Sequence, residues 1–177
     1  MKRFFSAVLC LLLAAALCGC NAIEGLIISG SDAGDDYSGS DEQQAVWAQA
    51  ADDEEYLKMM NEKLNEYIIC LTTLNAEKER LSALESEKKI QKDEQYIALN
   101  EEMLTWCAGA AGYPVEALSS QQAQEVCNLL HQLAETTAVY LEAYPKIAAE
   151  AYEGEPSAEE LENQMIEYAV AASELLD

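Results

Sequence analysis

Basic residues are scarce in this chain. Ten Lys and Arg stand against 33 Asp and Glu, so the formal net charge is −23 at pH 7. Nonspecific nucleic-acid binding needs Lys and Arg on the phosphates, so this balance excludes a nucleic-acid partner. The same charge repels anionic lipid headgroups, and electrostatic attachment to a membrane is not expected.

Motifs that carry enzymatic chemistry are also lacking. There is no Gly-x-Ser-x-Gly elbow, no phosphate-binding loop and no Ser/His/Asp set. The Glu85-Ser86 dipeptide resembles that of lytic transglycosylases, but Glu87, Lys88 and Lys89 surround it with charge, whereas a general acid needs a sheltered pocket. We therefore expect no enzyme and no cofactor.

Metal ligands are equally few. His131 is the one His in the chain, and it lies four residues after Cys127, on the same face of a predicted helix. Structural zinc requires four N or S ligands, so this pair alone predicts no metal site.

Long apolar runs are missing after residue 20. Before it, the basic residues Lys2 and Arg3 precede an uncharged apolar stretch, Phe4 to Leu17. A membrane-spanning helix needs about 20 apolar residues. The shorter stretch is typical of a secretory signal peptide.

The end of that stretch, Leu17-Cys18-Gly19-Cys20, resembles the lipobox of bacterial lipoproteins. Cys18 departs from the pattern, since Ala, Ser, Thr or Val is usual there. The resemblance covers residues 1–21 and implies recognition of Leu17, Cys18 and Gly19 by signal peptidase II. It further implies cleavage before Cys20 and a diacylglycerol, often with a further acyl chain, on that cysteine.

Three parts of the chain follow from this resemblance and from composition: a signal peptide over 1–19, a tether over 20–42 and a helical domain over 43–177. Cleavage would remove two basic residues and no acidic one, so the net charge would fall from −23 to −25. The tether is rich in Gly, Ser and Asp, which predicts a flexible, disordered linker.

The composition changes at Gln43, after which Ala, Leu, Glu, Gln and Lys predominate, all good helix formers. Apolar residues at helical spacing predict an all-α, up-down bundle of about four main helices. Residues 53–108 are predicted either as one long helix or as a helical hairpin with its tip near 86–93. Self-association through coiled-coil-like stripes is the alternative to an intramolecular bundle.

Local signals predict where the helices begin and end. Candidate capping boxes pair Asp52 with Glu55, Ser119 with Gln122 and Ser157 with Glu160. Pro145 is expected to break or kink its helix, with a short piece over 146–152 after it.

Cysteine and tyrosine supply the remaining candidates. Cys107 and Cys127 are the candidate disulfide pair, with three buried thiols, Cys70 included, as the equally weighted alternative. Five tyrosines on or near the stripes are expected at the margin of the core, because buried hydroxyls need partners: Tyr67, Tyr96, Tyr140, Tyr144 and Tyr168.

Together these features predict a lipid-anchored, extracytoplasmic helical protein of the bacterial cell membrane that binds or scaffolds an envelope partner without enzymatic activity. A small-ligand-binding lipoprotein is one rival, although such proteins are usually longer and combine strands with helices. A cell-wall enzyme is the other.

Overall fold

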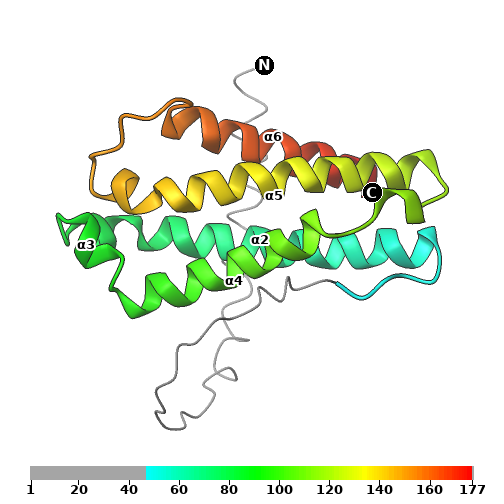
Figure 1. The fold of residues 1–177 in the computed structure, drawn as a ribbon, viewed down its shortest axis with the longest axis horizontal. Helices are drawn as coiled ribbons and strands as arrows, with labels where there is room; N and C mark the ends of the chain where they lie inside the picture. The colour runs from blue at the N-terminus through cyan, green and yellow to red at the C-terminus, as the bar shows by residue number, and fades with distance from the viewer. Residues whose placement is uncertain (1–46, 177) are drawn as a thin grey trace, which may run out of the picture. The chain divides into compact units, whose positions relative to one another are not determined.

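A computed structural model describes residues 47–176 (Figure 1). Regular structure within them is entirely helical, and four long helices are joined by short connections. The order is α2 (Asp53–Ser82), α3 (Glu87–Ile90), α4 (Glu94–Ala111), η2 (Val115–Ala117), α5 (Gln121–Ala148) and α6 (Ala158–Leu176). The long helices run alternately in opposite directions (Figure 1). The predicted all-α, up-down bundle is confirmed.

Helix α2 begins at the predicted cap. The Asp52 carboxylate accepts a hydrogen bond from Glu55 N at 2.9 Å, and Glu55 in turn accepts one from Ala51 N at 2.6 Å. These bonds satisfy amide groups that have no partner within the first turn. The apolar stripe then buries one face of the helix through Tyr56, Met60, Leu64, Tyr67, Cys70, Leu74 and Leu81.

The segment 53–108 is a hairpin, as one of the two predictions had it. Helix α2 ends at Ser82, and α4 begins at Glu94. Its cap is Asp93, whose carboxylate accepts a hydrogen bond from Tyr96 N at 3.0 Å. Between them, the four-residue helix α3 contacts α5, and its Ile90 side chain is fully buried. The one apolar residue of the polar interval therefore covers the end of the core.

Helix α5 differs from the prediction at both ends. Its cap is Ser120, which accepts from Ala123 N at 3.2 Å, and Ser119 instead donates to Asp53. The helix also continues through Pro145 to Ala148, so Pro145 does not break it and the separate short piece predicted over 146–152 does not form. Proline removes the amide that would bond to the carbonyl of Leu141. The Tyr96 hydroxyl donates to that carbonyl at 3.3 Å and replaces the missing partner.

Helix α6 follows the predicted capping box. The Ser157 amide donates to Glu160 Oε2 at 2.8 Å, and the Glu160 amide donates back to Ser157 Oγ at 3.3 Å. Helix α5 packs extensively on both α4 and α6, whereas the contact between α2 and α4 is smaller.

Tyrosine occupies the centre of the bundle. The expectation of a position at the margin of the core is therefore wrong for Tyr67, Tyr96, Tyr140 and Tyr144, whereas Tyr168 is partly buried at that margin as expected. Six tyrosines are at most 5% exposed: Tyr56, Tyr67, Tyr96, Tyr113, Tyr140 and Tyr144. Buried phenols are tolerated because their hydroxyls find partners inside the fold. The Tyr144 hydroxyl donates to the carbonyl of Leu74 at 3.0 Å, and that of Tyr67 lies 3.0 Å from Thr137 Oγ1.

Candidate functional site

A groove between α2 and α4 is the candidate site. It encloses about 220 Å³ and is bounded by side chains of both helices and by Trp47, which precedes α2. We call it the α2–α4 groove and define it by its lining residues: Trp47, Lys63, Glu66, Tyr67, Cys70, Glu102, Met103, Thr105 and Trp106.

Three aromatic rings form the inner wall of the α2–α4 groove. The Trp106 ring centroid lies 4.6 Å from that of Tyr67 and 5.5 Å from that of Trp47, with the two indole planes inclined at 70°. The Trp106 Nε1 group donates to the backbone carbonyl of Lys63 at 2.7 Å. Trp106 is therefore fixed to α2 by a hydrogen bond as well as by packing.

The absence of a side chain at Gly109 allows the Trp47 indole to pack against α4. A Cβ atom at this position of α4 would collide with the Trp47 indole ring. A glycine within a helix costs roughly 1 kcal/mol relative to alanine. The close approach of the indole is the physical reason for accepting that cost here.

Charged side chains surround the opening of the groove. Lys63 Nζ lies 2.8 Å from Glu66 Oε2. Glu102 enters no ion pair within residues 47–176, and α4 carries Glu94 and Glu101 besides it but no Lys or Arg. The rim therefore keeps an excess of negative charge.

Cys70 lines the groove but is not a reactive thiol. Burial, and next the hydrogen bond and negative charge of Glu102, raise the pKa of Cys70 to about 12. Because the thiolate is the nucleophile, this side chain is protonated and weakly reactive at neutral pH. It contributes apolar surface to the groove.

All three cysteines of the described part of the chain are free and buried. The structure thus has no bond between Cys107 and Cys127, and the three thiols are buried, as in the second of the two predictions. Burial raises the pKa of Cys107 to about 12 and also raises that of Cys127. Both thiols act as small apolar side chains between helices.

The Cys127 and His131 pair does share one helix face. The Cys127 Sγ atom lies 3.5 Å from His131 Nε2, which is itself 3.0 Å from the carbonyl oxygen of Tyr113. That ring nitrogen is therefore engaged in holding the α4–α5 connection. Within residues 47–176, no group of three or more His, Cys, Asp or Glu side chains is placed to hold a metal ion.

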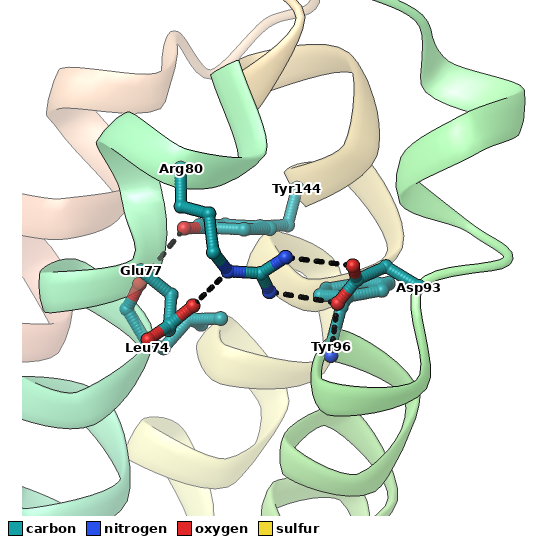
Figure 2. Close-up of polar contacts among 6 residues, drawn as sticks. All are labelled: Leu74, Glu77, Arg80, Asp93, Tyr96 and Tyr144. Carbon is teal, nitrogen blue, oxygen red and sulfur yellow. Dashed lines mark hydrogen bonds and ion pairs between the residues drawn. The ribbon is translucent and has the colours of Figure 1, made fainter. Parts of the chain in front are cut away.

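Arg80 joins the ends of α2 and α4 (Figure 2). Its two terminal nitrogens each donate to one Asp93 oxygen at 2.7 Å, and its Nε donates to Glu77. The guanidinium holds the pKa of Asp93 down at about 2, aided by the amide of Tyr96. Figure 2 shows this exposed network beside Tyr96 and Tyr144. It fastens the hairpin.

Glu85 and Ser86 lie in the turn after α2. Glu85 is exposed and has a positive φ of 52°, and neither residue lines the α2–α4 groove. The carboxylate is thus solvated, whereas a catalytic acid requires a sheltered position.

A second cavity of about 210 Å³ lies beside α5 and α6, lined by Glu135, Thr136, Val139, Pro156, Leu161 and Gln164. It lacks aromatic side chains and has a single charged one. The α2–α4 groove therefore offers the richer set of binding groups.

The predicted lipid-attachment residue Cys20 and the recognition residues Leu17, Cys18 and Gly19 lie outside the described residues, as does the predicted tether. No helix within 47–176 has the length and apolar character needed to cross a bilayer. Comparison of the chain with protein-family profiles, curated proteins and solved structures finds no match.

Sequence reasoning did not identify the α2–α4 groove. Nothing local in the sequence indicates that the indoles of Trp47 and Trp106 meet. Gly109 lies close to the end of α4, where a glycine by itself indicates only that a helix is ending. Its second role, to leave room for the Trp47 indole, depends on a contact between residues that are 62 positions apart in the sequence.

Proposed function

We propose that this chain is a lipid-anchored, extracytoplasmic helical protein of the bacterial envelope that binds or scaffolds another envelope component through the α2–α4 groove. The observation that carries the binding role is the groove itself, an aromatic wall with a charged rim on the bundle surface. The anchor rests on the Leu17-Cys18-Gly19-Cys20 motif.

The size of the groove favours a macromolecular partner over an enclosed small molecule. Sites that bury a drug-sized ligand measure roughly 300–1,000 Å³, and this groove encloses about 220 Å³. Aromatic side chains at a surface are typical anchor points of protein interfaces. The all-helical arrangement of residues 47–176 also differs from the strand-and-helix architecture expected of a substrate-binding lipoprotein.

The anchor is tested by replacing Cys20→Ala in cells fed a radioactive fatty acid. We expect loss of the label and release of the protein from the membrane fraction. The matched control is Cys10→Ala, which removes another leader cysteine, one preceded by Leu rather than Gly. Label and membrane retention in Cys20→Ala would refute the anchor.

The binding role is tested by a photo-crosslinking amino acid introduced in intact cells. Thr105 is exposed and lines the groove, whereas Ser173 is exposed on α6 outside it. A discrete adduct from position 105 and none from position 173 is expected. Adducts from neither position would refute a partner bound at the groove.

A further inference from the structure

We infer that the α2–α4 groove accepts a basic side chain, Arg or Lys, presented by a protein partner. The inference rests on the proposed binding function and specifies the chemistry of its ligand. A long basic side chain combines an apolar stem with a cationic head, and the groove offers a matching surface for each part.

The aromatic wall matches the stem and the flat face of the head. The half-buried Trp47 provides the accessible aromatic surface, and Tyr67 and Trp106, which are 1% and 6% exposed, form the rigid floor that supports it. Cations are attracted to aromatic faces within about 6 Å of the ring centroid, and Trp is the best of these rings. A guanidinium also stacks on such rings, which favours Arg over Lys.

The rim supplies the counter-charge. Lys63 is already paired with Glu66, so a cation entering the groove meets the carboxylate of Glu102. Helix α4 has no basic residue that would repel a cation. An entering carboxylate would lack a comparable free partner, so the rim selects for positive charge.

Charge also argues against two other occupants. The residues between Cys20 and Val46 contain no Lys or Arg, and the proposed cleavage before Cys20 would remove Lys2 and Arg3, so the processed N-terminal segment supplies no basic side chain. A second copy of the chain carries the same net charge of −23 and would be repelled. A basic protein is the partner that charge complementarity favours.

The two tryptophans make the groove directly measurable. The chain contains only Trp47 and Trp106, and both line the groove, so all tryptophan fluorescence originates there. The full chain in detergent is titrated with acetyl-Gly-Arg-Gly-amide. The comparison peptide replaces Arg by citrulline, which keeps the shape and removes the charge. Far-UV circular dichroism verifies that each variant is folded.

A saturable fluorescence change is expected with the arginine peptide and little change with the citrulline peptide. Glu102→Gln should weaken the arginine affinity roughly threefold, in the range of an exposed ion pair. The matched control is Glu101→Gln, which makes the same charge change one residue outside the groove lining. At about 0.15 M salt the Debye length is about 8 Å, so this control should change the affinity less than about 1.5-fold.

Three results would overturn the inference: no saturable change with the arginine peptide, equal binding of the citrulline peptide, or equal effects of Glu101→Gln and Glu102→Gln. If any of these occurred while position 105 still formed its adduct in cells, the binding function would stand with an occupant of different chemistry. Loss of that adduct would instead count against the proposed function.

Discussion

The hydrogen bond between Tyr67 and Thr137 joins α2 to α5 in the centre of the bundle. Its two hydroxyl oxygens are 3.0 Å apart, and the side chains are 1% and 0% exposed. Apart from the tyrosines and cysteines, Thr137 is the one residue with a polar side chain that is buried in residues 47–176. We predict that removing either hydroxyl destabilises the fold, but that removing both costs much less than the sum.

The free-energy cost of each single substitution depends on which buried hydroxyl is left without a hydrogen-bond partner. Thr137→Val keeps the shape but strands the Tyr67 hydroxyl without a partner, which costs about 1–3 kcal/mol. Tyr67→Phe strands a threonine hydroxyl, which is able to turn to the carbonyl four residues earlier in its helix. That substitution should therefore cost less, about 0.5–1.5 kcal/mol. In the double variant no hydroxyl is stranded, so the coupling free energy should be about 1 kcal/mol.

Urea unfolding followed by circular dichroism at 222 nm would measure the four free energies of the double-mutant cycle. Non-interacting sites add to within about 0.3–0.5 kcal/mol. If the cycle were additive within that margin, the two hydroxyls would not be coupled, and the reasoning would be refuted.

Asp93→Asn should lower the free energy of unfolding more at pH 5 than at pH 2. Arg80 lowers the folded-state pKa of Asp93 to about 2, so the ionised carboxylate stabilises the fold above about pH 4, and this stabilisation is lost as the pH falls. Parallel urea-stability curves of variant and wild type between pH 5 and 2 would contradict this. Gly109→Ala should displace the Trp47 indole and shift tryptophan emission to the red, even though alanine raises helix propensity by roughly 1 kcal/mol. An unchanged emission spectrum would argue against the contact between Gly109 and Trp47. Burial raises the pKa of Tyr56, Tyr67, Tyr96, Tyr140 and Tyr144, so above about pH 10 ionisation of these tyrosines favours the unfolded state. Loss of helix content and the rise of phenolate absorbance at 295 nm should therefore occur together. Complete ionisation of a protein that is still helical would be inconsistent with the raised pKa values.

Local signals in the sequence predicted much of the fold. The caps at Asp52 and Ser157 were identified correctly, because capping joins residues only three positions apart. The polar interval near 86–93 indicated the hairpin tip in one of the two predictions for this segment, and the helical spacing of apolar residues predicted the all-α bundle. These features depend on neighbouring residues, so the chain reveals them without knowledge of its tertiary contacts.

The errors occurred where a distant residue changed the outcome. Ser119 has the chemistry of a cap, but Asp53 of α2 accepts its hydroxyl proton at 2.9 Å, and Ser120 caps instead. Pro145 has the chemistry of a helix breaker, but Tyr96 of α4 bonds to the carbonyl that proline leaves without a donor. Neither partner is recognisable before the helices are packed.

The sequence by itself determined the helices, most of their boundaries, the net charge and the lipobox-like motif, because each is a property of adjacent residues or of composition. Tertiary structure alone decided which tyrosine hydroxyls meet which partners and where the α2–α4 groove lies. Those contacts join residues that are 70 positions apart for Tyr67 and Thr137, and 59 apart for Trp47 and Trp106. Helical periodicity specifies which face of a helix is apolar, but not which helix covers that face.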